Sequence, residues 1–395
     1  MKLKKSNEVN QAAGTKIMEK AITGLCNSPA YTNPQAAYMV TMEAMSSNAA
    51  ETPVTVKLWR QLYEVVQIIR QMEPWKYLDE TMRITLLLPG RDEPVYIVVM
   101  GNAEMTYGIG IYPGFESLRR LLSMGDVEEE GISIAFEQYC INLYFGEKDE
   151  LQDKDLSTIE KLGIKISGES EWPYFRSMKP GFLPWHINRD EAKLTLEALQ
   201  NFSMAFASYA KEGIEVDFEN GQTLLRFYDS DTDMWYNAAY KMPPVPFISP
   251  KMMIPDGMVS GIKKKKKNKA KLGFIMSYIP VPFQQSKKHR PRLPLVGILA
   301  NLNDGMIVDH AVSGENPAGN LLDARAEFIE FLFNYVENNG RPASIAVPNE
   351  DTHSFLEDFA SKLGIKLVID ERLTQISAMF TDMMGGFELI EDDLS

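Results

Sequence analysis

Apolar residues repeat at helical spacing from Val56 to Ile69, and Pro74 forbids continuation of that pattern. Short apolar runs of strand length follow, with turn signals at Pro89-Gly90 and Pro113-Gly114. These predicted strands cover residues 83–88, 95–100, 107–112 and 140–145. A helix followed by sequential strands with short turns predicts an N-terminal α+β domain built on an antiparallel meander.

Three local signals lie in the second half of this domain. Asn188 is placed to cap a helix over residues 189–211. Asn220-Gly221 lies between apolar runs and therefore predicts a hairpin. The run from Asp229 to Asp233 lacks the glycine and the final glutamate of a calcium loop, so we interpret it as a hairpin end.

Five prolines between Pro243 and Pro255 form the clearest break in composition and predict a domain boundary. Beyond the break, three strands are followed by alternating helices and strands. The predicted elements are strands 272–283, 293–300 and 306–312, helix 321–338, strand 343–347, helix 352–363, strand 365–369 and helix 374–384. This βββαβαβα order resembles the ribonuclease H-like fold, and the fold class of the whole chain is α+β.

These patterns divide the chain into four regions. Residues 1–52, rich in small and polar side chains, form a flexible N-terminal arm, and residues 53–242 form the first α+β domain. Residues 243–271 are a connection rich in proline and lysine. Residues 272–395 form a C-terminal α/β domain with an acidic tail.

Charge is distributed unevenly along the chain. The 395 residues include 41 Lys or Arg and 54 Asp or Glu, which gives a net charge of −13. Residues 251–300 contain 12 basic residues and one acid, a balance of +11, so the remainder has 29 basic and 53 acidic residues, or −24. An acidic body disfavours general attachment to nucleic acid or an anionic membrane, so we expect contact with a polyanion only in the basic segment.

The basic segment holds cations both before and after the strand predicted at 272–283. Two basic turns aligned on one edge could neutralise several phosphates of a nucleic acid. The alternative is a solvated lysine loop that keeps the connection open or pairs with the acidic body. The candidate nucleic-acid contacts within residues 263–292 are Lys263, Lys264, Lys265, Lys266, Lys267, Lys287, Lys288 and Arg290.

Residues 172–186 combine two Trp, one Tyr, two Phe and two cations with three prolines that exclude a regular helix. If exposed, this aromatic strap would be a docking platform for a partner, using Trp172, Arg176 and Trp185. If buried, it would be a stiff segment anchored over the first core.

Nucleases with the ribonuclease H-like fold hold two divalent metals between carboxylates from several elements. The strand predicted at 272–283 has no acid, so such a cage would be incomplete in this chain. The same acids are equally expected as helix caps and solvated positions. The catalytic candidates at the matching places are Glu327, Glu330, Glu350, Asp351 and Asp382.

The sequence contains few other residues that could form a disulfide, bind a metal or enter a membrane. Cys26 and Cys140 cannot form a disulfide framework, and the four histidines are far apart, so we expect no metal site and no cofactor. No apolar segment follows the basic residues Lys2, Lys4 and Lys5, and no apolar run reaches membrane-spanning length. The sequence predicts a cytoplasmic protein that does not enter a membrane.

Two groups of motifs resemble known families. Over about residues 57–210 the chain resembles an uncharacterised bacterial domain, through Trp172-Pro173, Phe175-Arg176-Ser177, Pro180-Gly181 and Pro184-Trp185. Asp304-Gly305, Arg341-Pro342 and Leu363-Gly364-Ile365 resemble a second uncharacterised bacterial domain that often follows the first. The resemblance implies a bacterial two-domain protein and no activity.

Without a catalytic constellation, the sequence predicts a non-catalytic binding or interaction protein with an unknown protein partner. The alternative is a nucleic-acid-binding or nucleic-acid-processing protein with a degenerate ribonuclease H-like domain. A third hypothesis is a subunit whose acidic body binds a basic protein.

Overall fold

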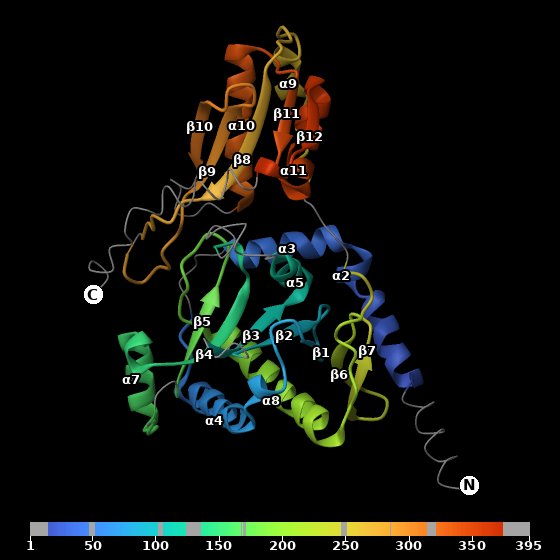
Figure 1. Cartoon of the computed structure of the whole chain (residues 1–395), viewed down its shortest axis with the longest axis vertical. Coiled ribbons are helices and arrows are strands. Elements are labelled where there is room, and N and C mark those ends of the chain that lie inside the picture. Colours follow the sequence, from blue (N-terminus) through green and yellow to red (C-terminus); the bar gives the residue numbers. More distant parts are fainter. Residues whose placement is uncertain are drawn as a thin grey trace.

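The protein is an α+β protein with two mixed sheets, one of seven strands and one of five (Figure 1). The computed structural model describes residues 15–46, 52–101, 106–123, 136–166, 168, 171–245, 251–284, 286–313 and 321–373. Among these residues, no helix is both long enough and apolar enough to cross a membrane.

The first sheet has the order β5-β4-β3-β2-β1-β6-β7. Its first five strands pair antiparallel with their neighbours along the chain, which confirms the predicted meander. β6 lies parallel to β1, and β7 is antiparallel to β6. The strands are β1 (Arg83–Leu87), β2 (Val95–Met100), β3 (Tyr107–Pro113), β4 (Cys140–Gly146), β5 (Trp172–Met178), β6 (Thr223–Asp229) and β7 (Met234–Tyr240).

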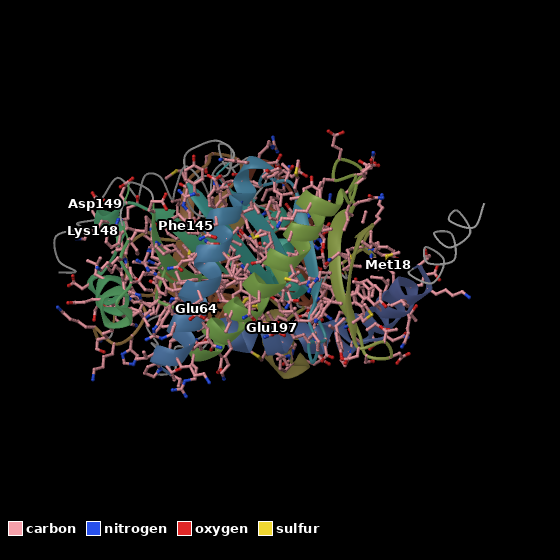
Figure 2. The ribbon with its side chains drawn as sticks, turned by 90° about the horizontal axis from the view of Figure 1, so that it is seen from below. Met18, Glu64, Phe145, Lys148, Asp149 and Glu197 are labelled. Carbon is pink, nitrogen blue, oxygen red and sulfur yellow. The ribbon has the colours of Figure 1, made fainter. Side chains whose placement is uncertain are left out.

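Helices cover both faces of this sheet. α4 (Val56–Met72) and α8 (Arg189–Glu212) lie side by side on one face (Figure 2). α5 (Gly114–Leu122) packs on the other face, where Phe115 joins the same apolar cluster as Tyr96 of β2. β2 is apolar throughout because both of its faces are buried. This domain also contains η1 (Pro74–Lys76), η3 (Lys148–Glu150) and α7 (Asp153–Leu162).

Residues 15–46 differ from the predicted flexible arm. They are helical over 15–26, α2 (Pro29–Thr32) and α3 (Pro34–Ser46). Ile22 packs against Leu225 and Phe227 of β6, and the Lys20 ammonium lies 3.5 Å from the Asp229 carboxylate. Apolar residues spaced along these helices dock them on the sheet, which composition alone did not reveal. Residues 1–14 and 47–51 lie outside the described part.

The Asn188 cap is confirmed, because its side chain accepts hydrogen bonds from the backbone N–H groups of Asp190 and Glu191 at 2.9 and 3.0 Å. The interpretation of the Asp229 to Asp233 run as a hairpin end is also confirmed, since it joins β6 to β7.

The hairpin predicted at Asn220-Gly221 is wrong. Residues 214–217 form no strand, so the turn joins α8 to β6. Asp217 holds the turn locally, because its carboxylate accepts both the backbone N–H and the side-chain N–H of Asn220. An Asx-type turn of this kind satisfies its own polar groups and needs no second strand.

The second sheet has the order β10-β9-β8-β11-β12. β8, β9 and β10 pair antiparallel, and β11 and β12 follow parallel to β8. These strands are β8 (Lys271–Tyr278), β9 (Leu295–Asn301), β10 (Ile307–Ser313), β11 (Ser344–Val347) and β12 (Lys366–Ile369). β8 ends five residues before the predicted boundary at 283, and the predicted helix 374–384 lies outside the described residues.

α10 (Leu321–Asn339) and α11 (Glu350–Leu363) cover one face of the second sheet. α9 (Asp256–Ile262) packs beside them, and Ile254 and Val259 are buried in the same core. Residues 254–271 were predicted to belong to the connection, but these apolar side chains tie them to the second domain.

The two domains are bonded to each other along the aromatic strap. The backbone N–H of Leu183 donates to Pro291 at 3.0 Å, and the N–H of Leu293 donates to Gly181 at 2.8 Å. Gly181 has a φ of 75°, and a Cβ at this position would lie 2.8 Å from the ring of Tyr278. Figure 1 shows α3 and α5 on the side of the first domain that faces the second.

Candidate nucleic-acid interface

Residues 263–267, the lysine turn, follow α9 at the end of the second domain farthest from the first (Figure 1). The backbone of Arg341 holds this turn, because its N–H donates to Lys266 at 3.0 Å and its carbonyl accepts from Asn268 at 2.8 Å. The Arg341 Nε also donates to the Lys265 carbonyl at 2.9 Å. Backbone bonds on both sides give the turn a defined shape.

Gly340 allows this close approach. Its φ is 84°, and a Cβ on it would lie 2.6 Å from the Lys266 carbonyl oxygen. Both the left-handed conformation and the contact therefore favour glycine.

Part of the lysine turn has a structural role at two helix ends. Lys267 Nζ donates to the Gly364 carbonyl at the end of α11, at 3.1 Å. Asn268 Nδ2 donates to the Asn339 carbonyl at the end of α10, at 2.9 Å. Cations and side-chain donors are favoured beside the unpaired carbonyls of helix C-termini. Lys267 is thus accounted for by the fold.

Lys263, Lys264 and Lys266 have no such role. All three are exposed, and no carboxylate among the described residues lies within 4.0 Å of their ammonium groups. Neighbouring lysines do have acidic partners, since Lys251 pairs with Glu357 at 2.6 Å and Lys362 with Asp256 at 2.9 Å. Lys362, and more weakly the charge of Lys263, lower the pKa of Asp256. None of the three ammonium groups forms a close ion pair with a described residue, so all three remain available for an external anion.

Other lysines extend the positive surface at this end of the sheet. In the strand register, Lys271 of β8 and Lys366 of β12 lie on either side of Ser344. Two strand spacings separate them, which is about 10 Å. The exposed aromatic residues of the described chain, Tyr77 and Phe283, lie elsewhere. The surface offers charge to phosphates but no ring on which a base could stack.

The second basic group does not join the first, so the expected alignment of two basic turns is wrong. β8 separates the two groups by its full eight residues, a length of about 26 Å. Lys287 and Lys288 are exposed, but Arg290 is only 4% exposed. Its guanidinium donates to the Ser177 carbonyl and lies 6.0 Å from the centre of the Phe182 ring. Arg290 therefore belongs to the domain junction.

The aromatic strap is mostly packed. Arg176 is 6% exposed, and its Nη2 lies 2.8 Å from Asp155 Oδ2. Burial alone raises the pKa of Asp155, but hydrogen bonds from His186 and Arg176 hold that pKa below its ordinary value. Trp172 and Trp185 are half-buried, and Trp185 is hydrogen-bonded through its backbone to Ser177. This arrangement matches the buried alternative and leaves Arg176 no access to a partner.

The catalytic candidates are dispersed. Glu327 and Glu330 are exposed on α10, and Glu350 and Asp351 lie in the first turn of α11. Asp351 Oδ2 accepts a hydrogen bond from Arg119 of α5 at 2.8 Å. Among the described residues no group of three or more His, Cys, Asp or Glu side chains could hold a metal ion. Asp382 lies outside the described residues.

Arg119 joins the domains electrostatically. Its guanidinium bonds both oxygens of Glu116, at 2.6 and 2.7 Å, and also reaches Asp351. Burial lowers the pKa of Arg119, but the hydrogen bond and charge of Glu116 outweigh burial and raise it overall. Sequence analysis missed this contact because 232 residues separate Arg119 from Asp351.

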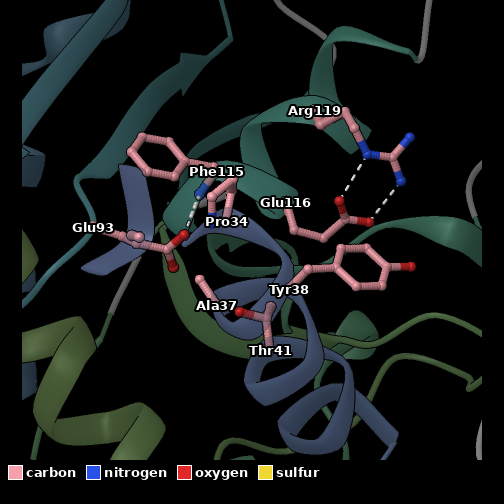
Figure 3. A pocket seen from close by; sticks show the side chains of 9 residues that line it. Pro34, Ala37, Tyr38, Thr41, Glu93, Phe115, Glu116 and Arg119 are labelled. Atoms are coloured by element: carbon pink, nitrogen blue, oxygen red, sulfur yellow. Dashed lines mark hydrogen bonds and ion pairs between the residues drawn. The ribbon is translucent and has the colours of Figure 1, made fainter. Parts of the chain in front are cut away.

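A small hollow lies between α3 and α5 beside this junction (Figure 3). Glu93 and Glu116 both line it, and Glu93 Oε1 accepts the N–H of Phe115 at 3.4 Å. Burial, assisted by the charge of Glu116, raises the pKa of Glu93. The hollow has a volume of about 20 Å³, room for about one water molecule, and is too small for an organic substrate.

Two family models match the chain. Residues 59–226 match a domain of unknown function, DUF7309, and residues 258–384 match another, DUF6930. The first range contains β1 to β5 and most of β6, and the second contains β8 to β12. The two uncharacterised domains expected from the sequence motifs are therefore confirmed. No curated protein matches the chain.

Proposed function

We propose that this chain, whose first domain matches DUF7309 and whose second matches DUF6930, is a non-catalytic protein that binds nucleic acid through the lysine turn. One observation carries the proposal. Lys263, Lys264 and Lys266 are exposed on a turn held by backbone bonds, and no described carboxylate lies within 4.0 Å of their ammonium groups. The rest of the chain is acidic, so any attraction for a polyanion is confined to this end of the second domain.

The arrangement of the second domain supports the same class of ligand by analogy. The strand order β10-β9-β8-β11-β12, with helices after β10 and β11, resembles a ribonuclease H-like topology. The scattered carboxylates Glu327, Glu330 and Glu350 favour binding over metal-assisted cleavage. We infer a domain that retains the architecture and binds without cutting.

The expected mode of binding is contact with phosphates and no reading of bases. Lysine ammonium groups are point charges that release counterions from the nucleic-acid backbone. The described residues of this surface include no exposed aromatic ring, so stacking on single-stranded bases contributes little. Affinity should therefore depend steeply on salt and only slightly on sequence.

The test is fluorescence anisotropy with a labelled 20-base-pair duplex over a series of salt concentrations. The variant Lys263→Ser/Lys264→Ser/Lys266→Ser leaves Lys267 and its helix cap intact. The slope of log affinity against log salt should become shallower by about 2 to 3, at about 0.9 for each lost phosphate contact. The matched control is Lys287→Ser/Lys288→Ser, which removes two exposed lysines at the far end of β8.

Equal slopes for the wild type and the triple variant, or no binding at low salt, would refute the proposal. Cleavage of the duplex with added Mg²⁺ or Mn²⁺, abolished by Glu327→Ala or Glu350→Ala, would overturn its non-catalytic part.

A further inference from the structure

β10 forms one edge of the second sheet and carries large apolar side chains in contact with solvent. Its residues Ile307, Val308 and Val312 are 55%, 42% and 50% exposed, and Met306 just before it is 66% exposed. Seven residues without proline, lysine or arginine make this a long edge, interrupted by one shift in register with β9 between Ile307 and Asp309. Such edges pair readily with another extended chain.

The other sheet edges carry features that limit pairing. β12 has four residues and begins with Lys366, and β5 contains Pro173, which has no N–H to donate. β7 packs through Tyr236 and Tyr240 against the helix at residues 15–26. β10 has a shift in register with β9 between Ile307 and Asp309, but it differs from the other three described edges in the large apolar side chains that it exposes.

The outer backbone of β10 is open. No described strand lies beyond it, and the N–H of His310 donates to the carboxylate of its own neighbour, Asp309, at 2.9 Å. That side-chain acceptor is local and can be replaced by the carbonyl of an incoming strand.

The two faces of β10 differ in chemistry. His310 and Val312 lie opposite Ile298 and Val296 of β9, on the face away from α10. Ile307, before the shift in register, lies opposite Ala300 on the same face. Asp309 and Ala311 lie on the other, where Ala311 packs in the core that contains α10. Asp309 is exposed, and α10, which packs against β10, carries two further exposed carboxylates, those of Glu327 and Glu330. One face is therefore apolar and the other acidic.

We propose that β10 docks an extended segment of a partner protein in which apolar and basic side chains alternate. The segment adds a sixth strand to the sheet, with its apolar residues beside Ile307 and Val312 and its basic residues beside Asp309. Charge complementarity selects this partner over a second copy, because two copies would bring the acidic helix α10 next to itself.

The test uses a fluorescein-labelled ten-residue peptide of alternating Val and Lys, with a Val and Glu peptide of the same length as its counterpart. At 150 mM salt the Val-Lys peptide should bind at least tenfold more tightly. The variant Ile307→Asn/Val312→Asn should weaken binding at least tenfold, and Val281→Asn, at an exposed valine elsewhere in the domain, should not. Amide hydrogen exchange over residues 307–312 should slow when the peptide binds.

Absence of binding would overturn the proposal. Binding that the double variant leaves unchanged would do so too, since it would place the peptide elsewhere on the acidic body. Sedimentation equilibrium provides a separate check. A dimer of the wild type that the double variant abolishes would assign this edge to a second copy and contradict the proposed partner.

Discussion

Two basic segments flank β8, and their cations lie in different surroundings. The lysine turn at its beginning leaves three ammonium groups in solvent, whereas the segment after it buries Arg290 between the domains. Both contribute equally, residue for residue, to the local charge of the sequence. The difference comes from what their neighbours offer. The hydrogen bonds from Arg341 to the lysine turn reach only backbone groups of that turn, so they do not bury its lysine side chains. Ser177 and Phe182, in contrast, contact the side chain of Arg290 directly.

The comparison shows that charge density along a chain does not by itself identify a binding surface. A guanidinium with a planar fork of donors can satisfy buried carbonyls and stack on rings, whereas an ammonium is strongly hydrated and remains in solvent. The type of cation thus separates the two segments as much as their position does. Buried arginines should contribute to stability, and exposed lysines to binding.

The largest expected effect concerns a third cation, Arg176, whose partner is a carboxylate. Asp155→Asn should lower the free energy of unfolding by about 3 kcal/mol at pH 7, because it leaves Arg176 buried without a counter-charge. The pKa of Asp155 is lowered in the folded state, so its contribution is full above pH 4. It is lost as the pH falls through the lowered pKa.

Urea denaturation between pH 7 and pH 2 measures this prediction. The wild type and Asp155→Asn should differ most at pH 7 and converge in acid. A difference that stays constant with pH would show that Asp155 remains charged, or remains neutral, over the whole range.

Arg290→Ala should have the next largest effect and lower the free energy of unfolding by about 2 kcal/mol. It removes a charged hydrogen bond to the Ser177 carbonyl and the contact with the Phe182 ring. Lys288→Ala, two residues away and exposed, should change the free energy of unfolding by less than about 0.5 kcal/mol. Similar small losses for both variants, measured by urea denaturation, would remove the distinction between buried and exposed cations.

Gly340→Ala should lower the free energy of unfolding by about 1 kcal/mol and should also shift the lysine turn. The added Cβ strains a φ of 84° and meets the Lys266 carbonyl. Gly257→Ala in α9, where a Cβ would meet nothing within 4 Å, should be neutral or stabilising. Thermal unfolding measures both. Gly340→Ala with wild-type stability would mean that the turn is not fixed by this contact.

The sequence was sufficient for the elements whose signals are local. The spacing from Val56 to Ile69 and the cap at Asn188 each predicted a helix that the structure contains. Asn220-Gly221 led to a wrong prediction because a local turn has the same residue pattern as a hairpin turn. The Asp217 carboxylate closes this four-residue turn by accepting hydrogen bonds from Asn220. Composition suggested a loose arm with short helices over residues 15–46, but not that these helices pack against the sheet, because that packing depends on distant residues of β6.

The candidate site was predictable only in part. The run of lysines was visible in the sequence as a charge cluster. The sequence did not show that Lys267 is bound at a helix end, through the Gly364 carbonyl, whereas Lys263, Lys264 and Lys266 are exposed. Arg119 and Arg290 find their partners 232 and 113 residues away. Contacts of such separation leave no periodic signal, so the domain junction could not be foreseen.

The most direct test of the central claim is lysine footprinting in the presence of a nucleic-acid duplex. The full chain is acetylated briefly with and without the duplex at low salt, and modification of each lysine is measured by mass spectrometry. The account predicts strong protection of Lys263, Lys264 and Lys266, and none of Lys287 and Lys288, which provide the internal control in the same sample. Equal protection of the two groups, or protection of neither, would contradict it.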